Sequence, residues 1–179
     1  MPAEQTHEIG RHGLIEARLV LDRVFTDSID LPFNAYEHPE KVTFDDPASP
    51  PKQFSFDLSG NFRRAEKRAV AGLKVAELFV EVKSYSEGSQ LLNEYDEFLR
   101  RAAIVGSMPR HRNSWFMFLS SVPFGTTYGV RLCDGDFLRN RSQNWAGGIQ
   151  APQDLHLRTA LVFGNLSLKR TFQAWSNPR

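Results

Sequence analysis

The stretch Glu77-Leu78-Phe79-Val80-Glu81-Val82-Lys83-Ser84-Tyr85 decides the fold that we expect for this chain. Its apolar residues predict a buried strand, yet the strand carries an acid at Glu81 and a base at Lys83. Side chains alternate along an extended chain, so Glu81 and Lys83 share one face with Phe79, opposite Val80 and Val82. Ionisable groups within an apolar strand cost desolvation free energy unless they pair or hold a metal ion. This pair is therefore the first indication of function.

Regular elements are expected on both sides of this strand. The apolar run at residues 115–119 predicts a second buried strand, and apolar residues three and four apart between Ser89 and Val105 predict the strongest helix. Together they form a βαβ unit, whose crossover is right-handed in nearly all proteins. Upstream, we expect an amphipathic helix from Gly13 to Phe25 and a strand over residues 53–60 that ends in a Ser59-Gly60 turn. A further buried strand is expected over residues 159–164.

The composition is that of one ordinary globular domain. Of 179 residues, 41% are hydrophobic and 24% are charged, and nothing divides the chain into two balanced halves. We expect a polar N-terminal tail over residues 1–12 and one domain over residues 13–179, with its core at about 13–122 and a C-terminal extension at 123–179. The formal charge of +1, from 22 Lys and Arg against 21 Asp and Glu, neither supports nor excludes binding to nucleic acid.

The sequence favours a reducing compartment. Cys133 is the only cysteine, which excludes an internal disulfide and a multi-cysteine zinc site. The N-terminal residues are acidic and polar where a signal peptide needs a basic start and an apolar run, and no stretch has the length of a membrane span. A cytoplasmic location without a membrane partner is the expectation. Three local basic clusters are interpreted as solvated surface: residues 63–68, Arg110-His111-Arg112, and Arg139 with Arg141.

The candidate site lies across the two central expected strands. An acid at Asp57 on one strand, Glu81-Val82-Lys83 on the next, a helix and then an apolar strand together resemble the core of the PD-(D/E)XK nuclease superfamily. Glu16 in the upstream helix makes the layout similar to the Holliday junction resolvase and Mrr-like branch. The resemblance covers about Gly13 to Leu119, and Phe56 stands where a proline often precedes the aspartate. It implies an α/β fold with a mixed central β-sheet flanked by helices, a restriction-endonuclease-like core.

The resemblance also implies a divalent-metal-dependent endonuclease that hydrolyses phosphodiester bonds, first of all in DNA. Asp57, Glu81 and the carbonyl of Val82 would hold Mg²⁺ or Mn²⁺, because hard cations prefer oxygen ligands. Lys83 would position the attacking water or help to deprotonate it, and would offset phosphate charge. Glu16 would complete the site through a water or a second ion. Nucleic acid is the implied partner, together with a homodimer or a larger protein complex.

Other interpretations stay open. Glu81 and Lys83 could form an ion pair on an exposed edge strand, Asp57 could begin the turn through Ser59-Gly60, and Glu16 could face solvent. At the level of function, one alternative is a catalytically inactive nuclease-fold subunit that binds nucleic acid or scaffolds a defence, repair or transposition complex. The other is an unrelated interaction domain in which these acids are structural.

Overall fold

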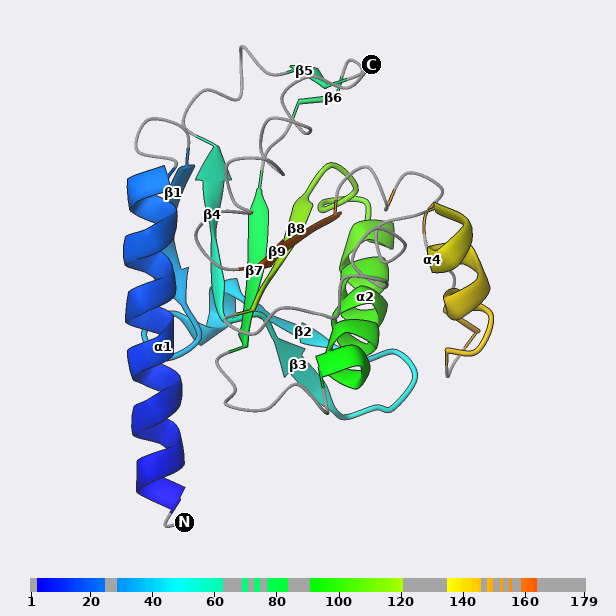
Figure 1. The fold of residues 1–179 in the computed structure, drawn as a ribbon. Coiled ribbons are helices and arrows are strands. Elements are labelled where there is room, and N and C mark those ends of the chain that lie inside the picture. Colours follow the sequence, from blue (N-terminus) through cyan, green and yellow to red (C-terminus); the bar gives the residue numbers. More distant parts are fainter. Residues whose placement is uncertain are drawn as a thin grey trace.

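The computed structural model describes residues 3–24, 29–62, 69–70, 73–74, 77–83, 91–120, 135–145, 148–149, 152, 155 and 159–163 (Figure 1). Within these ranges the elements are, in chain order, α1 (Ala3–Val24), β1 (Ile29–Asn34), the 3₁₀ helix η1 (Pro39–Lys41), β2 (Thr43–Asp45), β3 (Gln53–Ser55), β4 (Leu58–Phe62), β5 (Ala69–Val70), β6 (Leu73–Lys74), β7 (Leu78–Lys83), α2 (Leu91–Ser107), β8 (Trp115–Ser120), α4 (Gly135–Ser142) and β9 (Thr159–Phe163).

The main sheet has five strands in the order β1-β4-β7-β8-β9. β1, β4 and β7 are antiparallel neighbours, whereas β7 pairs with β8 and β8 with β9 in parallel. The expected α/β class with a mixed central sheet is therefore confirmed. The strand predicted from Glu81 and Lys83 is β7, and it is the central strand of the five. It is joined to β8 through α2, as expected for the βαβ unit.

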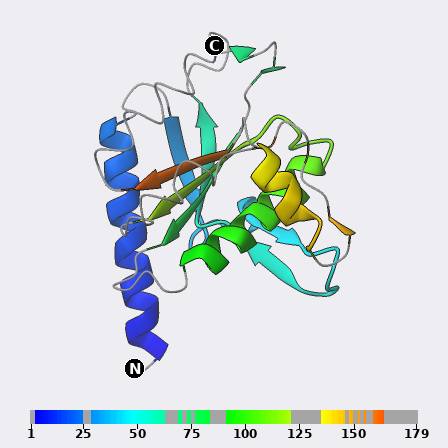
Figure 2. The ribbon, with the colours of Figure 1, turned by 45° about the vertical axis from the view of Figure 1, so that its right-hand side comes forward.

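Helices cover both faces of the sheet, with α1 on one side and α2 on the other (Figures 1 and 2). Leu14, Ala17 and Leu21 of α1 pack in one cluster with Leu78 and Val80 of β7. The opposite face packs against α2 in a second cluster that contains the odd-numbered Phe79. The two-residue alternation of β7 thus sends its even positions toward α1, and Glu81 and Lys83 toward the α2 side.

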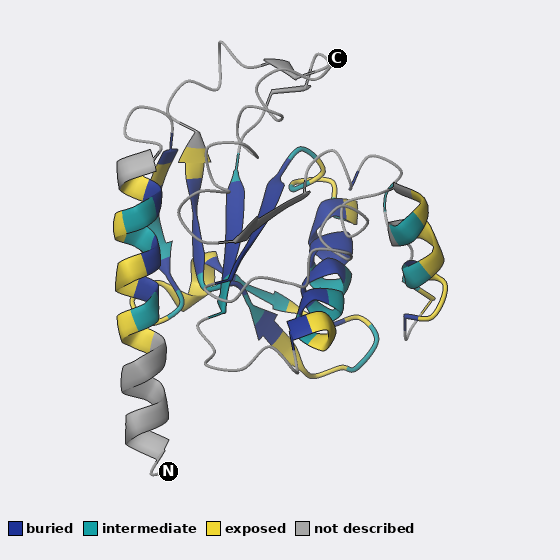
Figure 3. Ribbon diagram, viewed as in Figure 1, coloured by how far each residue is buried: buried dark blue, intermediate teal, exposed yellow. Residues whose placement is uncertain are grey.

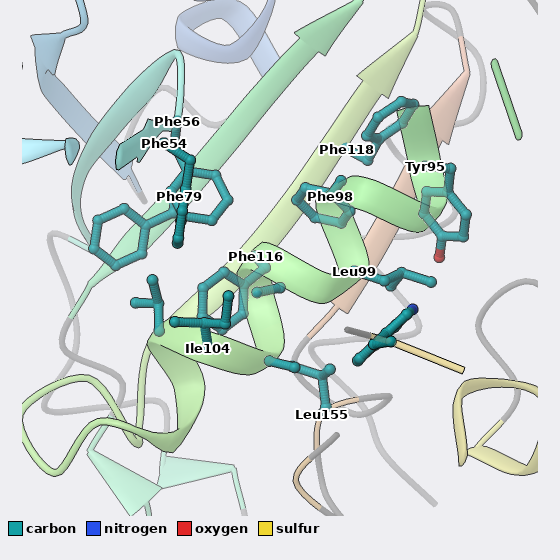
Figure 4. Packing of buried hydrophobic residues seen from close by; sticks show 14 of the residues in the cluster. Phe54, Phe56, Phe79, Tyr95, Phe98, Leu99, Ile104, Phe116, Phe118 and Leu155 are labelled. Carbon is teal, nitrogen blue, oxygen red and sulfur yellow. The ribbon is translucent and has the colours of Figure 1, made fainter. Parts of the chain in front are cut away.

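The cluster on the α2 side is rich in aromatic rings (Figure 4). Phe118 lies edge-on to Tyr95 of α2, and the rings of Phe79 and Phe116 stack at a centroid distance of 5.9 Å. Figure 3 shows the dark-blue band of buried residues that runs through the central strands and along α2. Full burial of such a side chain contributes about 1.5–3 kcal/mol relative to exposure, so this cluster holds α2 firmly over β7 and β8.

The single strand expected over residues 53–60 is two strands. β3 pairs with β2 in a small separate sheet, whereas β4 pairs with β1 and β7 in the main sheet. The chain passes from one sheet to the other at Phe56 and Asp57. The expected turn at Ser59-Gly60 is wrong, because Gly60 continues β4 opposite Leu78. A Cβ on Gly60 would collide with the backbone of Asp30 in β1, so glycine permits a close strand approach there.

The ends of the chain also differ from expectation. α1 begins at Ala3 and not at Gly13, so the described part of the segment expected as a polar tail is helical. Helix-forming residues such as Ala3 and Glu4 allow this extension although the segment is polar. In the expected C-terminal extension, β9 completes the main sheet and α4 lies near α2, whereas residues 164–179 fall outside the described ranges. Among the described helices, none is both long and apolar enough to cross a membrane.

Candidate active site

Asp57 lies where β4 begins, at the end of its pairing with β7. Its backbone N–H donates to the carbonyl of Val80 at 3.0 Å, and one carboxylate oxygen, Oδ2, accepts the N–H of Val82 at 2.7 Å. The Asp57 carboxylate therefore accepts the hydrogen bond that a backbone carbonyl of a neighbouring strand would otherwise accept from Val82 of β7. The N–H and C=O of one strand residue point to the same edge, so the Val82 carbonyl also points toward Asp57. Two of the three expected metal-binding groups thus lie together.

Glu81 is the buried charged residue of the central strand, with only 4% of its surface exposed. Its Oε1 accepts from Lys83 Nζ at 2.9 Å and lies 3.4 Å from a guanidinium nitrogen of Arg101. The other oxygen, Oε2, is buried and has no hydrogen-bond partner within the described part of the chain. The ion pair between Glu81 and Lys83 is real, but the interpretation as an exposed edge strand is wrong, because β7 is central. A buried carboxylate oxygen without a partner is costly, and either a proton or a bound ligand would offset that cost.

The two carboxyl groups influence each other. Burial raises the pKa of Asp57, although the hydrogen bond from Val82 and the charges of Lys83 and Arg101 oppose the rise. Burial and the neighbouring charge of Asp57 raise the pKa of Glu81 to about 7. A buried acid whose proton affinity is raised by a neighbouring carboxylate favours a proton or a cation between the two groups.

Lys83 lies between two acids. Its Nζ is 2.9 Å from Glu81 Oε1 and 3.1 Å from Glu94 Oε2 on α2. Burial acts to lower the pKa of Lys83, but the paired carboxylates outweigh it and raise the pKa above its ordinary value. Lys83 therefore remains an ammonium group that donates hydrogen bonds over the whole neutral range.

α2 contributes polar residues to the site that the sequence analysis did not single out. Glu94, Glu97 and Arg101 are three and four residues apart, so they share one face of the helix. Glu97 pairs with Arg101 at 3.2 Å and with Arg100 at 2.8 Å. Arg100 in turn binds Asp46, which lies in the proline-rich loop after β2. Charged residues at helical spacing beside the apolar stripe were the signal available in the sequence.

Glu16 is not brought to this site. It lies on α1, whose buried side chains pack on the face of the sheet opposite Glu81. Its side chain is 66% exposed and lies 3.5 Å from His12, one turn earlier on the same helix. The expected contribution of Glu16 to catalysis is therefore not supported, because the buried stripe of α1 turns Leu14 and Ala17, and not Glu16, toward the sheet.

The residues that remain fit a divalent cation of the magnesium class. Across the described ranges, no three His, Cys, Asp or Glu side chains are grouped closely enough to hold a metal ion. Mg²⁺ often keeps several waters and needs only one or two carboxylates from the protein. Asp57 and Glu81 are two such carboxylates, and Glu81 Oε2 has no hydrogen-bond partner among the described residues.

Comparison with known proteins identified no relatives. No protein-family model, no curated protein and no solved structure matched the chain. The geometry and chemistry of Asp57, Glu81 and Lys83 are therefore what indicates a function.

Proposed function

We propose that this chain is a divalent-metal-dependent nuclease that hydrolyses phosphodiester bonds, with DNA as the favoured substrate. One observation carries the proposal: among the described residues, the buried carboxylate of Glu81 has an oxygen without a hydrogen-bond partner, and it lies beside a second buried acid, Asp57. The order of the elements supports it. In the main sheet, β4 beside Asp57, β7 with Glu81 and Lys83, α2 and β8 follow α1 in the order that the resemblance to PD-(D/E)XK nucleases implies.

The two acids and the Val82 carbonyl would hold Mg²⁺ or Mn²⁺. When bound, such an ion supplies a water of lowered pKa and neutralises charge on the phosphoryl oxygens. Asp57 and Glu81 must lose their protons to bind a cation, so the raised pKa of Glu81, about 7, makes occupancy dependent on pH near neutrality. Asp57 is held in place for this role by the hydrogen bond from the Val82 amide.

Lys83 contributes positive charge and orientation. Its pKa is raised, so it is a poor proton acceptor, and the role left to it is to donate hydrogen bonds to the attacking water or to the phosphate. Two roles were expected for Lys83: to position the attacking water or to help to deprotonate it. A lysine that stays protonated fits the first role better than the second. Glu94 and Arg101 act as positioning residues, since Glu94 binds Lys83 and Arg101 binds Glu81.

A plasmid-nicking assay tests the proposal. Supercoiled DNA is incubated with the full chain and Mg²⁺ or Mn²⁺, and nicked product is measured over time. We expect cleavage that stops on chelation with EDTA and falls at least about 100-fold in Asp57→Asn and in Lys83→Ala, which remove a cation ligand and a water-orienting charge. Lys83→Arg should also lose most activity, because a planar guanidinium cannot replace a compact ammonium at this position.

Matched controls come from α1. Asp22→Asn makes the same chemical change as Asp57→Asn at an exposed position, and Glu16→Gln removes another exposed charge away from the site, so both variants should cleave like wild type. Unfolding curves in urea show whether each variant is folded. Cleavage that is unchanged in folded Asp57→Asn and Lys83→Ala would refute the assignment of these residues.

One observation favours a second function. Lys83 is already bound by two carboxylates, and Glu81 by two cations, so this network is largely satisfied without a metal ion. A catalytically inactive nuclease-fold subunit that binds nucleic acid or scaffolds a larger complex would look the same. This alternative would be favoured if the folded chain binds DNA but does not nick it in the presence of Mg²⁺ or of Mn²⁺, with every control variant folded.

A further inference from the structure

A polar cavity lies at the other end of β7 from Glu81. Its volume is about 270 Å³, and its lining comes from η1 and β2, from β4, and from the turn that follows α2; it includes Lys41, Thr43, Ser59, Glu77, Arg110 and His111. Glu77 and Glu81 are four residues apart, which is about 13 Å along a strand. The cavity is therefore separate from the candidate active site.

His111 is the best-positioned ligand group in this cavity. Its Nδ1 lies 2.6 Å from Glu77 Oε2, and Ser114 Oγ donates to the same oxygen at 3.3 Å. The ring also lies edge-on to Phe44 and Phe79 at centroid distances of 5.4 and 5.6 Å, and its side chain is only 12% exposed. Because the Glu77 carboxylate accepts from Nδ1, the other nitrogen, Nε2, is available, and it has no hydrogen-bond partner among the described residues.

Two cations beside this ring are also uncommitted. Neither Lys41 nor Arg110 forms an ion pair within the described part of the chain, whereas the α2 arginines Arg100 and Arg101 are both paired. Lys41 Nζ is held 5.7 Å from the centroid of the Phe33 ring at the same cavity. Of the lining acids, Glu77 is bound by His111, and Glu40 lies 3.8 Å from His38. Among the described lining residues, the charged side chains without an ion-pair partner are therefore Lys41 and Arg110.

We propose that this cavity binds a phosphate group. His111 Nε2 donates to a phosphate oxygen when the ring is protonated, and Lys41 and Arg110 supply the counter-charge. The volume is below the range of about 300–1,000 Å³ that is typical of sites for drug-sized ligands, which suits a small oxyanion with its attached sugar. The phosphate belongs either to a nucleic-acid strand or to a small free phosphate. The basic cluster at Arg110-His111-Arg112, interpreted from the sequence as solvated surface, thus contributes two residues to a site.

The test is a titration followed by NMR of the His111 imidazole, with the full chain in buffer that contains no phosphate and no divalent ion. The probes are inorganic phosphate, a short oligonucleotide with a 5′-phosphate, and the same oligonucleotide without it. We expect phosphate to shift the His111 resonances, and the double variant Lys41→Gln/Arg110→Gln to weaken binding at least tenfold. The double variant Lys52→Gln/Arg112→Gln removes the same charge at exposed positions outside the lining, and it should change binding less than twofold.

The probes also separate the two sources. If inorganic phosphate shifts the His111 resonances, the proposal is supported and the ligand is a small phosphate. If only the phosphorylated oligonucleotide shifts them, the proposal is supported and the ligand is the phosphate at a strand end. Resonances that no probe moves would overturn the proposal, as would equal weakening in the two double variants. Equal shifts from both oligonucleotides would support the proposal with an internal phosphate of a strand as the ligand. Because no divalent ion and no cleavage are involved, the result is independent of whether Asp57 and Glu81 form an active site.

Discussion

The substitution Glu81→Gln should remove a large part of the pH dependence of stability. In the folded chain, burial and Asp57 raise the pKa of Glu81 from an ordinary 4.5 to about 7. Below pH 4.5 the carboxyl is protonated in both the folded and the unfolded chain, so no stability is lost through this group. Between these values the unfolded chain releases the proton more readily than the folded chain does. The free energy of unfolding therefore falls as pH rises through this window, by on the order of 3 kcal/mol.

The assay is urea unfolding at pH 5 and pH 8. Wild type should lose stability between the two, with a contribution from Asp57 in the same direction, because its pKa is also raised. Glu81→Gln cannot ionise at this position, so the loss between pH 5 and pH 8 should be smaller by about 2–3 kcal/mol. Glu16→Gln is the matched control, since the Glu16 side chain is 66% exposed, and its loss should equal that of wild type.

A divalent ion extends the same experiment. Saturating Mg²⁺ at pH 8 should recover much of the stability of wild type, because an ion that binds only the folded chain stabilises it. Glu81→Gln should recover much less, since a neutral amide is a weaker ligand than a carboxylate. The reasoning is refuted if wild type and Glu81→Gln lose the same free energy between pH 5 and pH 8.

Two further predictions concern the scaffold of the site. Gly60→Ala should destabilise the fold by about 3 kcal/mol or more, because the added Cβ would meet the backbone of Asp30, whereas Asn61→Ala on the same strand is exposed and should change stability by less than about 0.5 kcal/mol. Phe118→Ala should cost about 3–5 kcal/mol, because the ring is fully buried against Tyr95 and Phe98, while Leu92→Ala at a position 42% exposed on α2 should cost far less. The urea midpoint of unfolding is measured for all four variants. Equal midpoints for Gly60→Ala and Asn61→Ala, or for Phe118→Ala and Leu92→Ala, would contradict the packing described.

The central features of the fold could be predicted because their signals are local. The alternation around Glu81 indicated a buried strand with two charges on one face, and the apolar run at residues 115–119 indicated its parallel neighbour. The spacing in α2 was that of a helix with one buried side. The two-residue period put Glu81 and Lys83 on one face, and the resemblance to PD-(D/E)XK nucleases implied that Asp57 lies on a neighbouring strand.

Features that depend on long-range contacts could not be predicted. Ser59-Gly60 resembles a turn, and only the approach of β1 shows that the glycine lies inside a strand. Glu16 has the residue type expected of a ligand, but the register of α1 on the sheet turns it to solvent. Similarly, Lys83 pairs with Glu94, which is 11 positions away, and His111 pairs with Glu77, which is 34 positions away. No local sequence pattern predicts either pair.

The hydrogen bond from the Val82 amide to Asp57 gives the site its own spectroscopic reporter. The bond is 2.7 Å long and ends on a carboxylate oxygen, so the amide proton senses whether that oxygen is charged. Protonation of Asp57 or capture of a cation would draw charge away from the acceptor and move the Val82 amide resonance. The backbone of the central strand can therefore be used to follow the state of the neighbouring acids without labelling any side chain.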